Sequence, residues 1–260
     1  MPQVRGLPRH LDQWEMGGRR SFEAFDVADA AGLSRLTTLG LGLASDGILA
    51  EILPSCAALS ELRLTSGQLE QLPDSIGELQ RLETLHLFYC RRLRALPGAI
   101  GRLAPFLATL DVYNCSRLER LPEALGEFHS LTTLTISFAP SLAALPDSLG
   151  RLGSLRMLVA YHCKALTALP ESVGALSELE TLDLGESSAL AFLPEALGQL
   201  PALHSLELMA CTGLEELPSN LGQLAALRLL DIRMCGGLKA KGKAALPEGL
   251  ADRPELKVKR

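Results

Sequence analysis

The residues best suited to chemistry are six cysteines, and five of them occupy one position of a repeating pattern. Each of the five stands five residues after the first leucine of a Leu-x-Leu segment: Cys90, Cys115, Cys163, Cys211 and Cys235. Neighbouring strands lie about 4.8 Å apart, so Cys90 and Cys115 are close enough for a disulfide by distance alone. Ala139 and Ser187 hold the same position on either side of Cys163, however, and neither can form a disulfide. We therefore predict buried thiols that pack as small apolar groups, donate weak hydrogen bonds to backbone carbonyls and suit a reducing compartment.

Motifs for catalysis are absent from the sequence. It has no Gly-x-x-x-x-Gly-Lys-Ser/Thr loop, no His-Glu-x-x-His, no Cys-x-x-Cys pair and no Gly-x-Ser-x-Gly turn. A row of acids does recur one residue after a proline: Asp74, Glu123, Asp147, Glu171 and Glu195. A carboxylate there meets the positive end of a helical segment's dipole. The sequence thus predicts no enzyme, no metal site and no cofactor.

The more informative candidates are the residues one, three and four positions past each leading leucine. All three tyrosines of the chain fall there, although aromatic residues make up only 4% of it. The predicted partner-binding residues are His86, Phe88, Tyr89, Tyr113, Asn114, Phe138, Tyr161, His162, Asp183, Glu186, Glu207, Met209 and Arg233. Exposed tyrosine and phenylalanine are typical anchors of protein interfaces. The alternative is that Tyr89, Phe138 and His162 pack against the end of each strand.

A period of about 24 residues defines the elements that must position these side chains. The leading leucines are Leu39, Leu62, Leu85, Leu110, Leu134, Leu158, Leu182, Leu206, Leu230 and Leu256, which predict ten repeats. Each Leu-x-Leu segment reads as a short strand with leucines inward. A Leu-Pro-x-x-apolar-Gly unit follows, with the proline predicted at the first helical position and the glycine closing the turn at positive φ.

The ends and irregularities follow from the same pattern. One extra residue near 104–106 predicts a convex bulge, and the spacing lengthens to about 29 residues between Pro218 and Pro247, with the addition in 236–245. Residues 21–31 predict a capping helix over the open core, with Trp14 nearby. We expect a segment 1–32 with that cap and a repeat domain 33–260.

Composition excludes several classes of protein. The net charge is −5 with acids and bases interleaved, which argues against a nucleic-acid binder; Lys239, Lys241 and Lys243 read as a solvated end. No apolar run reaches the ~18 residues of a membrane span, and no secretory signal opens the chain. A cytoplasmic monomer that contacts neither membrane nor nucleic acid is expected.

The repeat at 82–103, LETLHLFYCRRLRALPGAIGRL, resembles the plant-type cytoplasmic leucine-rich repeat. The resemblance covers about residues 33–258. It implies an α/β repeat solenoid, a horseshoe with a parallel sheet on the concave face and short helical or 3-10 segments on the convex face.

Repeats of this type occur in plant intracellular immune receptors and in type III effectors of plant-pathogenic bacteria. The repeats are rich in Ala, Leu and Arg, a composition that suggests GC-rich codons and favours the bacterial case. The resemblance thus implies a virulence protein delivered by type III secretion into the host cytoplasm, where its concave face binds a host protein. The alternative is the substrate-recruiting half of a ubiquitin ligase or transferase whose catalytic domain lies outside this chain. A structural array in a bacterial or algal cytosol is the third hypothesis.

Overall fold

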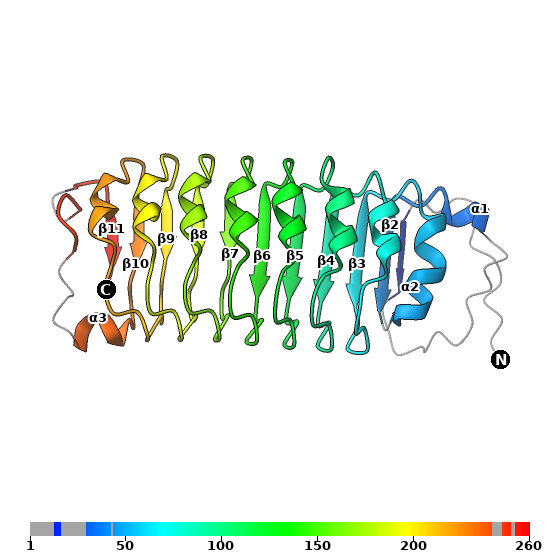
Figure 1. Ribbon diagram of the computed structural model, residues 1–260, viewed down its shortest axis with the longest axis horizontal. Coiled ribbons are helices and arrows are strands. Elements are labelled where there is room, and N and C mark those ends of the chain that lie inside the picture. Colours follow the sequence, from blue (N-terminus) through cyan, green and yellow to red (C-terminus); the bar gives the residue numbers. More distant parts are fainter. Residues whose placement is uncertain (1–12, 17–29, 43, 241–245, 251–252) are drawn as a thin grey trace.

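The computed structural model describes residues 13–16, 30–42, 44–240, 246–250 and 253–260. Within them, eleven strands form one parallel sheet in which each strand pairs with its neighbours in chain order. Short helices return the chain on the other side, so the body is elongated, with a strand layer and a helix layer (Figure 1). The predicted leucine-rich-repeat solenoid is confirmed.

The strands are β1 (Gln13–Met16), β2 (Thr38–Gly42), β3 (Glu61–Thr65), β4 (Thr84–Phe88), β5 (Thr109–Tyr113), β6 (Thr133–Ser137), β7 (Met157–Val159), β8 (Thr181–Asp183), β9 (Ser205–Glu207), β10 (Leu229–Asp231) and β11 (Lys257–Lys259). The α-helices are α1 (Ala30–Leu33), α2 (Asp46–Ile52) and α3 (Gly236–Ala240). The 3-10 helices are η2 (Leu53–Ser55), η3 (Asp74–Glu78), η4 (Gly98–Leu103), η5 (Glu123–Glu127), η6 (Asp147–Arg151), η7 (Glu171–Ala175), η8 (Glu195–Gln199) and η9 (Ser219–Gln223).

The leading leucines stack in register along the sheet from Leu39 to Leu230. The last strand departs from prediction, because Leu230 pairs with Val258 and not with Leu256. In this register the segment 257–259 alternates lysine, valine and lysine, so Val258 is the residue that packs against the core. Leu256 packs there too, but from just before the strand.

The sheet also begins one strand earlier than the leucine pattern predicts. The backbone of β1 pairs with β2, with Trp14 opposite Leu39. This strand carries no leading leucine, so the period does not reveal it. The predicted capping helix over 21–31 lies outside the described residues except for its last two, which open α1.

The core runs the length of the sheet as a single stack. The leading leucines from Leu39 to Leu230 are all fully buried, as are the leucines that return the chain after each turn, such as Leu93 and Leu118. Phe128 ends η5 where Leu152 ends η6, and it is among the largest fully buried side chains. Each repeat thus buries its apolar face only against its neighbours, as expected of a solenoid.

The prolines before the 3-10 helices sit one residue earlier than predicted. Pro97, Pro122 and Pro146 have extended backbone angles with ψ near 150°, and each precedes its helix instead of opening it. The proline carbonyl accepts the first hydrogen bond of the helix, as from the Ile100 N–H at 3.1 Å. Proline therefore fixes the entry angle of the chain, and its missing N–H is outside the helix.

The glycines of the Leu-Pro unit are required for a different reason from the one predicted. Among the described glycines only Gly249 has a positive φ. The unit's glycines lie inside the 3-10 helices, pressed against the next repeat: a Cβ on Gly150 would lie 2.3 Å from the Ser172 carbonyl oxygen. Their role is close packing between repeats, and the positive-φ prediction is wrong.

The irregular repeats follow the sequence. The extra residue near 104–106 lengthens η4 to six residues against five in η5, and Phe106 is exposed on this convex bulge. The long spacing after Pro218 accommodates α3, and residues 241–245 are outside the described part. The acidic row starts the 3-10 helices as predicted, and some of its members also reach the next repeat. The Glu195 carboxylate accepts the Ser219 N–H at 2.9 Å.

The cysteine row lies at the turn after each strand. All six cysteines are buried, and none of them joins another in a disulfide. The Sγ of Cys211 lies 3.1 Å from the Leu184 carbonyl oxygen of the preceding repeat, and Ser187 makes the equivalent bond to Ala160 at 2.9 Å. The predicted S–H donation to backbone carbonyls is confirmed. Burial raises the pKa of the Cys163 thiol, and that of Cys211, to about 12.

Candidate functional site

The outward face of the sheet, concave in this fold, is set by strand alternation. On β4, Leu85 and Leu87 point into the core while Thr84, His86 and Phe88 are half-buried on the other face. The parallel register then stacks Phe88 beside Tyr113 and His86 beside Asp111. Residues of equal position on successive repeats therefore form rows across the face.

One residue in the turn that follows each strand from β4 to β10 has a left-handed backbone. The row of positive-φ residues, all with φ between 55° and 60°, is Tyr89, Asn114, Phe138, His162, Glu186, Ala210 and Met234. This region disfavours most L-residues, aromatic ones included. From Tyr89 to Ala210 it is maintained because each N–H continues the ladder to the next repeat, as from Phe138 to the Tyr161 carbonyl at 2.9 Å. The turn thereby aims one side chain from each of these seven repeats along the rim of the sheet.

Seven rings from four successive repeats form what we call the aromatic cluster: His86, Phe88, Tyr89, Tyr113, Phe138, Tyr161 and His162. Ring centroids are 5.2 Å apart for Tyr113 and Phe138, edge to face, and 4.7 Å apart for Phe138 and His162, stacked. Tyr89 is 42% exposed, and the other six rings are half-buried. The cluster is therefore one continuous, stiff and partly apolar surface.

The cluster ends in polar contacts at Glu186. The Tyr161 hydroxyl donates to Glu186, and His162 Nδ1 lies 2.8 Å from the other carboxylate oxygen. The hydrogen bond to Glu186, with some burial, raises the pKa of Tyr161 to about 12. The Tyr161 and His162 hydrogen bonds in turn lower the pKa of Glu186. Glu186 thus fixes two rings of the cluster while remaining half-exposed itself.

Beyond Glu186 the face becomes acidic. Asp183, Glu207 and Asp231 occupy paired positions on β8, β9 and β10. Burial raises the pKa of Asp183, and the like charges of Glu207 and Asp231 add to that shift, while the Gly185 N–H donates to it at 2.9 Å. Negative charge is therefore concentrated where it is poorly solvated, which favours a basic group from a partner.

The remaining predicted residues are placed less favourably for binding. Arg233 forms a two-pronged pair with Asp231, with Nη2 to Oδ2 at 2.7 Å, so its charge is already compensated. This pair lowers the pKa of Asp231 to about 2. Met209 is half-buried, and its carbonyl accepts the Glu186 N–H at 2.7 Å. Asn114 lies in the positive-φ row between Tyr89 and Phe138.

The residues just before the leading leucines also belong to this face, and the sequence reasoning missed them. Met157 is 41% exposed, and Glu61 lies 3.7 Å from His86 Nε2. Asp111, which follows Leu110, lies 3.4 Å from the other ring nitrogen of His86, Nδ1. The alternation of side chains along a strand could have identified them, because the residues before and after an inward leucine both point outward.

The side chains on the outward face are arranged in a way that suits contact with another molecule. Among the described residues, no three His, Cys, Asp or Glu side chains are grouped so as to hold a metal ion. None of the described helices has the length and apolar character needed to cross a bilayer. The face offers ring surface at one end and the carboxylates of Asp183 and Glu207 at the other, while Asp231 is paired with Arg233 and Lys259.

Solved structures similar to this chain are leucine-rich-repeat proteins. The leucine-rich-repeat domain of the type III effector XopL is 29% identical over 76% of this chain and 69% of that chain, with a TM-score of 0.67. A leucine-rich-repeat protein of Leptospira interrogans is 27% identical, over 79% of this chain and 56% of its own, with a TM-score of 0.54. A TDR receptor at 22% identity and TM-score 0.62 shares the fold; this chain spans 39% of it and matches over 87% of its own length.

No family model matches the sequence, and no curated protein matches it. The structural likeness supports a repeat module of the protein-binding kind.

Proposed function

We propose that this leucine-rich-repeat solenoid is a non-catalytic recognition module that binds a host protein through the aromatic cluster and the acidic face beside it. The observation that carries the proposal is the cluster itself. Rings from four repeats form a continuous series of contacts on the outward face, although aromatic residues make up only 4% of the sequence. Stiff aromatic area with a polar rim is typical of interface anchors.

The expected partner presents an apolar element next to a basic one. The apolar element would cover Tyr113, Phe138 and Tyr161, and the basic element would lie against Asp183 and Glu207. Complementary charge of this kind sets orientation and partner choice. The likeness to the XopL domain supports a bacterial effector that acts in the host cell.

Affinity capture from a plant-cell extract tests the proposal. The bait is the tagged chain, compared with Tyr113→Ala/Tyr161→Ala and with a matched control, Phe106→Ala/Phe192→Ala, which removes two exposed aromatic rings that lie outside the cluster. We expect one or more host proteins to be retained by the intact chain and by the control and to be lost by the tyrosine variant. Equal retention by all three baits, with all three folded, would remove the cluster from the proposal.

A further inference from the structure

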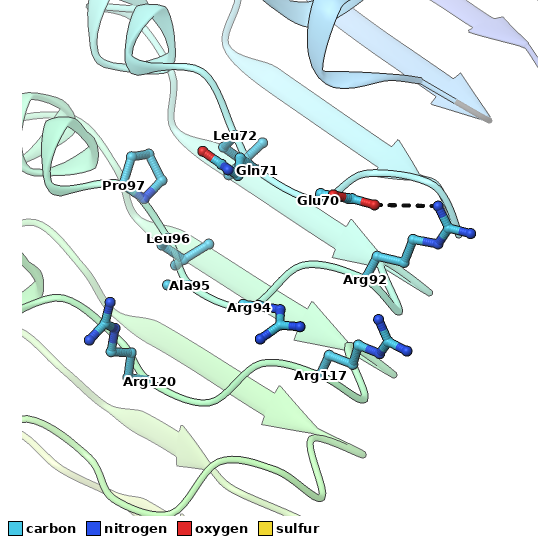
Figure 2. A pocket seen from close by; sticks show the side chains of 10 residues that line it. All are labelled: Glu70, Gln71, Leu72, Arg92, Arg94, Ala95, Leu96, Pro97, Arg117 and Arg120. Carbon is cyan, nitrogen blue, oxygen red and sulfur yellow. Dashed lines mark hydrogen bonds and ion pairs between the residues drawn. The ribbon is translucent and has the colours of Figure 1, made fainter.

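We infer that a groove at the strand-end edge of the solenoid binds an acidic peptide segment through arginines of two neighbouring repeats. The groove lies along the segments that leave β3, β4 and β5 and has a volume of about 420 Å³. Figure 2 shows Arg92, Arg94 and Arg117 near the strand ends and Arg120 farther along, toward Leu96 and Pro97.

The positive charge of this groove is only partly compensated. Glu70 lies 3.4 Å from Arg92, and Glu119 lies 3.6 Å from Arg94, with all four side chains more than half exposed. Solvent screens such pairs, so they are readily exchanged. Within the described part of the chain, no acid forms an ion pair with Arg117 or Arg120. An incoming carboxylate therefore finds two guanidinium groups already available and two held weakly.

The fold does not require these arginines. In the next repeat, Ser141 stands where Arg117 stands, and Ala144 where Arg120 stands, with the same strand pairing between β5 and β6. The repeats are stacked closely here. The backbones of Arg120 and Ala95 form an isolated β-bridge, and the Glu119 N–H donates to the Arg94 carbonyl at 2.9 Å. Like charges on adjacent repeats repel each other, which is a cost to the free protein that a negative ligand relieves.

The geometry favours carboxylates on a peptide. Arginine presents a planar fork that matches a carboxylate with two parallel hydrogen bonds. Leu96 and Pro97 give the groove apolar surface for the carbon chain of glutamate. A long polyanion such as a nucleic acid would also meet the acidic repeats that carry Asp183 and Glu207. The net charge of −5 on the chain disfavours such a ligand further.

The groove adjoins the aromatic cluster but shares no residue with it. The Arg91 guanidinium lies 5.8 Å from the centre of the Tyr89 ring, between the cluster and Arg92. One partner could therefore span both surfaces. Because the residues differ, a peptide assay tests the groove alone, and its failure leaves the aromatic site standing.

The test is fluorescence anisotropy with a fluorescein-labelled hexaglutamate peptide at low ionic strength. The groove variant is Arg117→Ser/Arg120→Ala, which uses the residues of the next repeat. The control is Arg102→Gln/Arg151→Ala on the convex 3-10 helices, and it removes the same amount of positive charge as the groove variant. The new residues are those found at the same helix position in other repeats, Gln199 in η8 and Ala175 in η7. Melting curves of all proteins establish that each is folded.

We expect the peptide to bind the intact chain and the control alike, and the groove variant at least about fivefold more weakly, with binding lost as salt rises. Absence of peptide binding, or equal loss in both variants, would overturn the assignment. Binding of oligothymidylate or phosphatidylserine vesicles as tightly as the peptide, with the same loss in the groove variant, would replace the peptide by a phosphate-bearing ligand and would also overturn it.

Discussion

Asp183 holds its charge at a cost to the stability of the free protein. Its raised pKa means that the folded state binds the proton more tightly than the unfolded state does. Stability contributed by this group therefore falls as pH rises through the ordinary carboxyl range and is lowest at neutral pH. A residue kept under these conditions fits a role in binding, because a basic partner group would relieve the same strain.

Asp183→Asn should raise the melting temperature at pH 7 by about 1–3 °C, because the amide oxygen can still accept the Gly185 N–H. The difference from the intact chain should shrink as pH falls below about 4, where both carry a neutral side chain. The same change should weaken partner binding. Thermal melting at several pH values checks it, with Glu83→Gln as an exposed control. A lower melting temperature at pH 7 would show Asp183 to be structural.

For single residues, the sequence predicts which face of the sheet a side chain points to, but not which residue it pairs with. Alternation placed Phe88, Tyr113 and Tyr161 on one face, and the structure joins them into a cluster. Arg233 is among the predicted partner-binding residues, and the structure instead pairs it with Asp231, two residues away. Such a pairing depends on rotamers and on the curve of the turn, and neither is encoded in the spacing.

The 3-10 helices of neighbouring repeats approach each other so closely that only glycine fits between them. The period locates these glycines, but it cannot distinguish a positive-φ turn from a close approach, since both select the residue without a Cβ. The left-handed positions fell instead on the row from Tyr89 to Met234, most of which are not residues that favour it. Ladder hydrogen bonds between repeats outweigh that local preference.

Gly150→Ala should lower stability by about 1–3 kcal/mol, because its Cβ would lie 2.3 Å from the Ser172 carbonyl oxygen and 2.7 Å from the Ser172 Cβ. Gly153→Ala is the matched control, since its Cβ would meet nothing within 4 Å. That change should be neutral or slightly stabilising. Urea unfolding of the two variants provides the comparison, and equal midpoints would refute the packing role.

On the scale of the whole molecule, the parallel stack and its leucine core follow directly from the period. The ends do not, because β1 lacks a leading leucine and β11 uses Val258 where the period alone suggests Leu256. End strands are paired on one side only and therefore need less of the repeat's pattern. This is why the sequence locates the array well and its limits poorly.

The buried cysteine ladder predicts a chain whose thiols are all reduced and slow to react. Burial raises the pKa of Cys56 to about 11 and that of Cys163 to about 12, so little thiolate forms at these two residues near neutral pH. A hydrogen bond with Cys115 lowers the pKa of Cys90, but the Cys90 side chain is fully buried and therefore closed to reagents. Thiol titration should find almost no reaction in the folded protein. After unfolding without reductant it should find six free groups. A peptide linking Cys90 to Cys115 would contradict the expectation of a reducing compartment.

We expect the outward face, and not the convex face, to carry the partner contact. The most direct test is the affinity of a captured partner for two variants: Tyr113→Ala/Tyr161→Ala on the sheet face and Glu171→Gln/Glu195→Gln on the helix face. Each glutamate should contribute only about 0.3–1 kcal/mol to stability near a helix start. Calorimetry should show binding weakened several-fold or more by the tyrosine changes, with the melting temperature nearly kept, and almost unchanged by the glutamate changes. A large loss of affinity in the glutamate variant alone, with both variants folded, would contradict binding through the outward face and place the contact on the convex side.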